Sequence, residues 1–400
     1  MIKRHLAKAI EKYAKEYPVI AIVGPRQSGK TTLAKMRFPN HSYISMENAD
    51  SRSYAVSDPR GFLSDYPAPV IIDEIQRTPE LFSYLQEAAD NTTEHPGYVL
   101  TGSQQFLLME SISQSLAGRI AYFRLYPFTY NELYDPRADR SIEDIFQGRI
   151  RKSQAVGKST EDILFKGMYP RIHDRSLTPT RWLENYIATY VERDIRQLVN
   201  ISDLRTFENF LKMTAAQSGQ LLNCTTLSNG LGISVPTVKR WLSLLETSGI
   251  VFVLQPHFRN FGKRIVKTPK VYFIDTGLLC CLLSIRNSDV LKNHPLYGSI
   301  FENFIISEFY KRIHHLGETP QIFFWRDRQG LEIDLMIDCG NRLIPVEIKS
   351  SKTFSPHLCA NLKKWTSLEG NQNCAGLIVY DGERPFGTRS EISTLPWRNL

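Results

Sequence analysis

The chain has 400 residues, which is more than one ordinary hydrophobic core accommodates, so two or three domains are expected. Hydrophobic residues make up 42% of the sequence and charged residues 22%, a composition that excludes a disordered or membrane-embedded chain. The net charge of +8 is uneven, because residues 1–135 hold 14 basic and 15 acidic residues and the remainder holds 35 and 26. A basic rear part is compatible with a nucleic-acid partner but does not establish one.

The amino-terminal stretch MIKRHLAKAIEKYAKEYP has charges at helical spacing and no uncharged core, so it does not resemble a signal peptide. The most apolar stretch, VYFIDTGLLCCLLSI, is short and is interrupted by Asp275, which argues against a membrane span. The six cysteines form no C-x-x-C pair and no cysteine–histidine cluster, so we expect reduced thiols. These features predict a cytoplasmic protein.

The first motif follows the apolar run of residues 19–23, which reads as a buried strand. The next residues, GPRQSGKTT, match the phosphate-binding pattern G-x-x-x-x-G-K-[ST] and lead into a helical stretch. Glycines let the backbone turn its N–H groups toward phosphate, Lys30 is expected to reach the β- and γ-phosphates, and the Thr31 hydroxyl to bind Mg²⁺. The predicted ATP-binding loop comprises Gly24, Pro25, Arg26, Gln27, Ser28, Gly29, Lys30, Thr31 and Thr32.

Acidic and polar residues follow the next two predicted strands. In PVIIDEIQ, four apolar residues indicate a buried strand, and Asp73 and Glu74 follow at its carboxyl end. Asp73 is placed to hold Mg²⁺ through water, and Glu74 to polarise the attacking water. The strand GYVLTGSQ ends in Ser103 and Gln104, which either sense the γ-phosphate or form an ordinary polar turn.

The stretches GPRQSGKTTL, PVIIDEIQ, LTGSQQFLL and LAGRIAYFRLYPFTYNEL together resemble the AAA-type ATPase domain that is paired with a domain of unknown function, DUF4143. The resemblance implies ATP binding and hydrolysis by Lys30, Asp73, Glu74 and Ser103. AAA-type ATPases usually borrow an arginine from a neighbouring subunit, which implies a homo-oligomer such as a ring. Arg119 is the first candidate for that arginine, and a purely structural arginine is the alternative.

The sequence of the middle of the chain predicts a connecting region followed by a helix-turn-helix. Residues 136–200 read as a charged linker followed by a helical connector. In residues 201–275, TTLSNGLGISVPTVKRWLSLLETSGI predicts two helices, the second starting at Thr237, and VFVLQP and KVYFID predict the strands of a wing. This order resembles winged-helix domains. Lys239 and Arg240 lie near the start of the second helix, where they contact either DNA or a protein partner.

The last predicted feature is a hairpin in EIDLMIDCGNRLIPVEIKSS. Strand alternation turns Asp334 to one face of its strand and Glu347 and Lys349 to one face of the next. Two close carboxylates repel one another unless one is protonated or a cation lies between them, and oxygen ligands suit Mg²⁺ or Mn²⁺. A bound cation lowers the pKa of its water, and Lys349 is placed to orient that nucleophile.

With Glu302 upstream, this order resembles the PD-(D/E)xK nuclease superfamily. The resemblance implies that Asp334 and Glu347 bind metal, that Lys349 is catalytic, and that Glu302 is an auxiliary acid. Such folds also serve as binding modules without cleavage, and a solvated polar hairpin is a further alternative. We therefore expect an α/β protein with a P-loop ATPase domain (1–135), a linker and connector (136–200), a winged-helix-like domain (201–275) and a nuclease-like domain (276–400).

Overall fold

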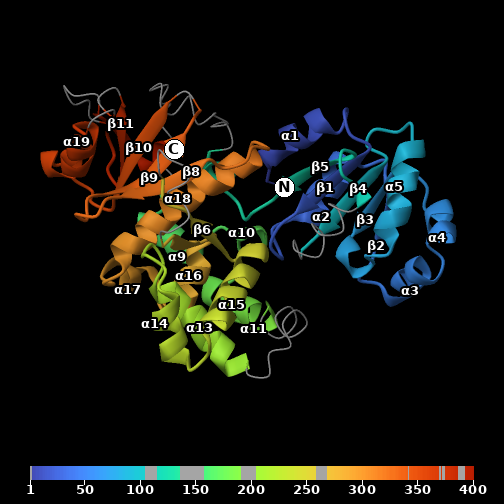
Figure 1. Cartoon of the computed structure of the whole chain (residues 1–400), viewed down its shortest axis with the longest axis horizontal. Helices are drawn as coiled ribbons and strands as arrows, with labels where there is room; N and C mark the ends of the chain where they lie inside the picture. Colours follow the sequence, from blue (N-terminus) through green and yellow to red (C-terminus); the bar gives the residue numbers. More distant parts are fainter. Residues whose placement is uncertain are drawn as a thin grey trace. The chain divides into compact units, whose positions relative to one another are not determined.

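The computed structural model describes residues 2–103, 115–135, 157–190, 204–257, 268–340, 342–368, 371, 374–385 and 392–400 (Figure 1). Two compact units are present. The first unit contains Met1–Phe128, Thr247–Ile250 and Lys311–Thr319. The second contains Thr129–Glu246, Val251–Tyr310 and Pro320–Leu400. Both units therefore contain segments that are distant in sequence.

A five-stranded parallel sheet forms the centre of the first unit. Its strands lie in the order β2 (Ser42–Ser45), β3 (Val70–Asp73), β4 (Tyr98–Gly102), β1 (Val19–Val23) and β5 (Ile120–Arg124). Its helices are α1 (Leu6–Tyr13), α2 (Lys30–Arg37), α3 (Ala49–Ser57), α4 (Pro59–Asp65) and α5 (Leu81–Asn91), with a 3₁₀-helix, η1 (Ile75–Arg77). The predicted α/β fold of this part is confirmed.

Alternate residues of β1 enter two different hydrophobic cores, because successive side chains point to opposite faces of a sheet. Val19, Ala21 and Val23 pack into one core, and Ile20 and Ile22 pack into the other. All five side chains are fully buried. A sheet that is covered on both faces leaves its carboxyl edge for polar residues, and the loop after β1 and the acids of β3 lie at that edge.

The second unit begins with helices and a short antiparallel ladder. The helices are α7 (Tyr130–Tyr134), α9 (Thr160–Lys166), α10 (Pro170–Asp174), α11 (Pro179–Tyr190), α13 (Leu204–Ala216), α14 (Cys224–Leu231), α15 (Val235–Thr247), α16 (Thr276–Leu282) and α17 (Ser288–Lys292). Strands β6 (Val251–Leu254) and β7 (Lys270–Phe273) pair in antiparallel fashion after α15. The order α14, α15, β6 and β7 is the one that the sequence predicts, although α15 starts at Val235 rather than Thr237.

A second five-stranded sheet follows, in the order β12 (Ile392–Pro396), β11 (Gly376–Tyr380), β10 (Leu343–Lys349), β9 (Glu332–Asp338) and β8 (Ile322–Arg326). Strands β8, β9 and β10 are antiparallel, and β10, β11 and β12 are parallel. Helix α19 (Ala360–Thr366) packs Leu362 and Trp365 against one face. Helix α18 (Tyr297–His315) precedes the sheet, and the 3₁₀-helices η4 (Pro356–Cys359) and η5 (Trp397–Asn399) complete the described elements.

Within the described part of the chain, no helix has both the length and the apolar character that crossing a membrane requires.

Candidate functional site

The loop between β1 and α2 has the backbone that a phosphate-binding loop needs. Gly24 and Gly29 have φ angles of 150° and 95°, which residues with a side chain rarely adopt. A Cβ atom at Gly24 would also collide with the Leu125 carbonyl. Lys30 Nζ donates to the carbonyl oxygens of Gly24 at 3.0 Å and Pro25 at 2.9 Å, so its ammonium group lies within the loop.

Asp73, at the end of β3, is surrounded by hydroxyl donors. Thr31 Oγ1 donates to its two carboxylate oxygens at 3.0 and 3.1 Å, and the Tyr43 hydroxyl donates at 2.8 Å. Thr101 on β4 donates to Oδ1. Burial and the neighbouring Asp73 raise the pKa of Tyr43 to about 12, so this hydroxyl stays a donor. The structure thus brings the two predicted Mg²⁺ residues of this unit, Thr31 and Asp73, into direct contact.

Glu74 lies beside this pair and has a defined orientation. Its backbone is left-handed, with φ 55°, and its Oε2 accepts from Gln76 Nε2 at 2.5 Å and from Ser103 Oγ at 2.8 Å. Burial alone would raise the pKa of this carboxyl, but the Lys30 charge and the two hydrogen bonds hold it below its ordinary value. Glu74 is therefore an ionised acceptor at neutral pH. Ser103 touches this acid, and Gln104 lies outside the described residues.

Arg4 is a residue of this site that the sequence did not indicate. Its side chain is buried, and its guanidinium donates to the carbonyl oxygen of Ser28 in the loop at 2.8 Å and to that of Tyr126 at 2.6 Å. The guanidinium also lies 4.6 Å from the centre of the Phe128 ring. Arg4 thus fixes the phosphate-binding loop to the segment that follows β5. No local pattern distinguishes it from the other basic residues near the amino terminus.

Arg119 has a partner within its own chain. Its Nε lies 2.5 Å from Asp90 Oδ1, and its Nη2 donates to Asp90 Oδ2 at 2.9 Å. The carbonyl oxygen of Arg119 accepts from the amide of Val19, the first residue of β1. Because the phosphate-binding loop follows the last residue of β1, Arg119 lies at the opposite edge of the sheet from that loop.

We therefore expect Arg119→Ala to leave ATP turnover unchanged, because the guanidinium is already bound to Asp90. Phosphate release at saturating ATP measures this, with Arg119→Lys and Asp90→Asn as controls that separate the charge from the pairing. A loss of turnover in Arg119→Ala that persists at saturating ATP, with Asp90→Asn still active, would instead support the role of an arginine supplied to a neighbouring subunit.

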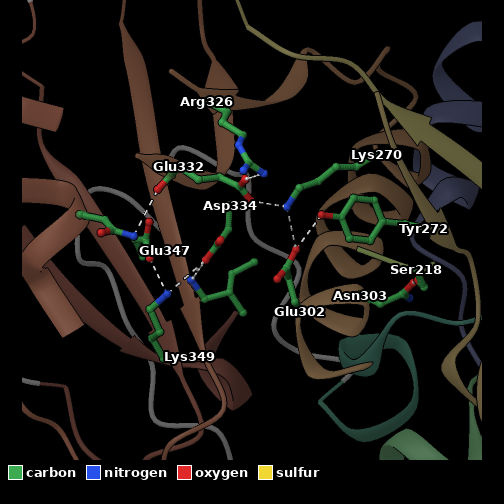
Figure 2. A network of polar contacts seen from close by, with 12 residues as sticks. Ser218, Lys270, Tyr272, Glu302, Asn303, Arg326, Glu332, Asp334, Glu347 and Lys349 are labelled. Carbon is green, nitrogen blue, oxygen red and sulfur yellow. Dashed lines mark hydrogen bonds and ion pairs between the residues drawn. The ribbon is translucent and has the colours of Figure 1, made fainter. Parts of the chain in front are cut away.

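A second polar site lies on β9 and β10 of the second unit (Figure 2). The register that pairs Val346 with Leu335 places Glu347 opposite Asp334. Lys349 Nζ lies 2.5 Å from Glu347 Oε2 and 3.5 Å from Asp334 Oδ2. Asp334 Oδ2 also accepts from the amide of Ile348 at 2.8 Å. The structure therefore brings Asp334, Glu347 and Lys349 together on one face of the hairpin.

Glu302, on α18, lies in an adjoining network. It accepts from the Tyr272 hydroxyl at 2.7 Å and from Lys270 Nζ at 3.4 Å. The same Lys270 Nζ lies 2.5 Å from Glu332 Oε1, and Arg326 donates to Glu332 Oε2 at 3.1 Å. Sequence reasoning missed Lys270, Tyr272 and Glu332. The available signal was the alternation of Lys270 and Tyr272 in KVYF, which puts both on one face of an apolar strand.

Burial and mutual repulsion dominate the electrostatics of these acids. Burial, followed by the Asp334 charge, raises the pKa of Glu347 to about 8 and that of Glu302 to about 7. Burial opposes the charged form of Lys349, but Asp334 and Glu347 outweigh it and raise the pKa of the ammonium group. The site therefore stabilises added positive charge.

The three predicted metal ligands of the second unit do not all fit one divalent cation. In the described chain, no three histidine, cysteine, aspartate or glutamate side chains are arranged to hold a metal ion. The structure therefore does not assemble Glu302, Asp334 and Glu347 into one ligand set, because Lys270 and Tyr272 engage Glu302. Asp334 and Glu347 still fit a hard cation. Glu347 is fully buried, and Lys349 and Asn361 hydrogen-bond to its carboxylate.

Three family models match this chain. They are an AAA domain over residues 16–134, a domain of unknown function (DUF8612) over 157–289, and a domain of unknown function (DUF4143) over 297–400. The AAA match confirms the predicted ATPase-type domain, and the DUF4143 match confirms that part of the resemblance. The front part of the protein is thus an AAA-type P-loop domain.

Among solved structures, the Walker-type ATPase PABY2304 of Pyrococcus abyssi is similar with 15% identity and a TM-score of 0.45, over 69% of this chain and 94% of that one. The Thermotoga maritima RuvB Holliday junction branch migration motor has 18% identity and a TM-score of 0.30, over 62% and 86%. These scores do not establish a shared overall fold.

Two mycobacterial proteins match almost the whole chain. The uncharacterised proteins Rv2008c of Mycobacterium tuberculosis and Mb2031c of Mycobacterium bovis are each 30% identical over 397 residues, which is 98% of this chain and 83% of theirs. An uncharacterised protein of Haemophilus influenzae is 27% identical over 222 residues, 54% of this chain and 51% of that protein. The chain therefore belongs to the family of Rv2008c and Mb2031c, and it combines an AAA domain with the DUF8612 and DUF4143 domains.

Proposed function

We propose that this protein binds and hydrolyses ATP in its first unit and that the nucleotide state controls a DNA-handling, nuclease-like centre in its second unit. The observation that carries the ATPase proposal is the meeting of Lys30, Thr31, Asp73 and Glu74 at one edge of a parallel sheet. Thr31 and Asp73 are in direct contact, and the Lys30 charge favours the ionised form of Glu74, as phosphoryl transfer to water requires. A homo-oligomer, such as a ring, is part of the proposal.

In the ATPase reaction, Lys30 would exchange its two carbonyl contacts for the β- and γ-phosphates, which keeps a full charge beside the transferring group. Thr31 and Asp73 would hold Mg²⁺, which neutralises charge on the phosphates. Glu74 is ionised and would accept a hydrogen bond from the attacking water. Gln76 and Ser103 orient Glu74, so its carboxylate needs little reorganisation during the reaction.

In the second unit, Asp334 and Glu347 would hold Mg²⁺ or Mn²⁺, and Lys349 would orient the water nucleophile and offset phosphate charge. A divalent ion in such a site supplies a bound water of lowered pKa. The raised pKa of Glu347 supports the proposal, because a nearby cation would favour the ionised form that this buried carboxyl otherwise resists.

Helix α18 supports the proposed control by nucleotide. Within the first unit, the Tyr126 amide donates to His315 Nε2 at 3.1 Å, and Lys311 Nζ donates to the Phe128 carbonyl at 2.9 Å. Arg4 joins that same segment to the phosphate-binding loop. Glu302 lies further back on the same helix, within the second unit. A change in the loop that shifts the last turn of α18 would therefore bias the position of Glu302.

Charge supports DNA as the partner. The chain after Asp135 has an excess of basic residues, and Lys239 and Arg240 are exposed near the start of α15. The opposite face of this helix is occupied, because Trp241, Leu242 and Leu245 are buried. The two basic side chains are thus available to phosphate, as in helices that lie in a DNA groove.

DNA should stimulate ATP hydrolysis, and the stimulation should weaken as salt is raised, because binding to phosphate releases counter-ions. ATP turnover is measured with and without duplex and single-stranded DNA over a series of salt concentrations. Lys239→Ala with Arg240→Ala should reduce the salt dependence while leaving DNA-independent turnover intact. Lys15→Ala, at an exposed lysine of the first unit, is the matched control.

The alternative is a nucleotide-dependent protein-interaction switch in which the nuclease-like centre does not cut. The engagement of Glu302 by Lys270 and Tyr272, in place of a third metal ligand, favours this alternative. It predicts neither DNA binding at low salt nor stimulation of turnover by DNA.

A further inference from the structure

Lys270 is a buried cation that the proposed mechanism does not use. It is the first residue of β7, and only 4% of its side chain is exposed. It belongs to the DUF8612 match, whereas Glu302 and Glu332 belong to the DUF4143 match. A lysine so deeply buried is costly unless acids pair with it, so its position requires an explanation.

The contacts of Lys270 are with two acids at once. Its Nζ lies 2.5 Å from Glu332 Oε1 and 3.4 Å from Glu302 Oε1. A lysine side chain within hydrogen-bonding distance of two carboxylates balances their negative charge. Figure 2 shows this group pointing between the two carboxylates. It occupies a place where oxygen ligands converge from two elements, α18 and β9.

Two-metal phosphodiesterase centres hold their ions about 3.5–4 Å apart, and each ion needs carboxylate ligands. Here the carboxylates form two pairs. Asp334 and Glu347 face Lys349, which is 30% exposed, whereas Glu302 and Glu332 are bridged by Lys270, which is 4% exposed. The negative charge of Glu302 and Glu332 is therefore already balanced by the ammonium group of Lys270.

We propose that Lys270 replaces a second divalent ion in this centre, so that the site binds one cation, between Asp334 and Glu347, and is completed by a strand of the preceding domain. This inference rests on the proposed metal-dependent function and adds a positioning residue to it. Lys270 would keep Glu302 and Glu332 in place beside the ion. Residues 297–400 alone would lack it.

The test is to count Mn²⁺ ions bound by the full-length, nucleotide-free protein, using calorimetry and electron paramagnetic resonance. The wild type should bind one ion that Asp334→Asn abolishes. Lys270→Met should bind one ion more than the wild type, because Glu302 and Glu332 lose the lysine charge between them. Lys270→Arg and the exposed-site control Lys292→Met should match the wild type. Any Mn²⁺ ion bound at the phosphate-binding loop is counted equally in every variant, so it does not affect the differences between them.

An unchanged ion count in folded Lys270→Met would overturn the proposal. If this variant is too unstable to titrate, the triple variant Lys270→Met, Glu302→Gln, Glu332→Gln is compared with it by thermal melting. Recovered stability supports a charge-balancing role, and equal instability contradicts it because packing alone would then explain Lys270. Failure of the proposed function is distinct: no Asp334-dependent ion in the wild type would refute the metal centre, whatever Lys270→Met binds.

Discussion

Replacing Lys30 with alanine should reduce ATP hydrolysis by at least about 10²–10³-fold, the range expected when one preorganised group that stabilises transition-state charge is removed. Lys30 is buried in its loop, with its ammonium group between the carbonyls of Gly24 and Pro25. A bound nucleotide would bring phosphate oxygens to that position. Without the lysine, those oxygens would face only the backbone dipoles of the loop and would lose the full positive charge at the start of α2.

Phosphate release at saturating ATP measures the loss in Lys30→Ala, and binding of a fluorescent ATP analogue separates lost affinity from lost turnover. Lys15→Ala is the matched control, because it removes an exposed lysine from the same unit. Circular dichroism establishes that both variants fold. Normal hydrolysis by folded Lys30→Ala would refute the ATPase assignment and, with it, the proposal that nucleotide controls the second unit.

The second large effect is expected at the proposed metal centre of the second unit. Purified protein should nick DNA in the presence of Mg²⁺ or Mn²⁺, and either Asp334→Asn or Lys349→Ala should lower the rate by about 10²-fold or more. Asp334→Asn removes the charge that faces Glu347 while keeping the shape of the side chain. Lys349→Ala removes the cation that lies 2.5 Å from Glu347, and with it the group that orients the nucleophile.

Asp338→Asn is a matched control on the same strand, because Asp338 accepts from the Gly340 amide in the following turn. It should leave nicking unchanged. Equal residual cutting in Asp334→Asn, Lys349→Ala and the wild type would identify a contaminating nuclease. Complete absence of cutting by the wild type, together with intact DNA binding, would favour a binding module built on the same fold.

Arg4 joins the phosphate-binding loop to the segment that follows β5. Arg4 holds Ser28 of the loop and Tyr126 of the segment that the last turn of α18 contacts. A nucleotide that reordered the loop would change the energy of these contacts. The proposed nucleotide control would use this route, because α18 also carries Glu302.

Most of the ATPase site could be predicted from the sequence because its information is local. Glycines at fixed spacing, a lysine at the start of a helix and acids directly after an apolar strand depend on neighbours within a few residues. Parallel strands then bring their carboxyl ends to one edge, which is why Thr31 and Asp73 meet although 42 positions separate them. The strand alternation of residues 333–337 and 346–349 likewise determined which charged side chains share a face.

Only the tertiary structure determined which residues pair with these charged side chains. Lys270 reaches Glu302 and Glu332 from 32 and 62 positions away, Arg4 reaches Tyr126 from 122 positions away, and Asp90 takes the guanidinium of Arg119. None of these pairs has a local signature, because the packing of distant elements decides which partner comes within a few ångströms of each side chain. Sequence periodicity determined the direction in which each side chain points, and the packing of distant elements determined what it meets.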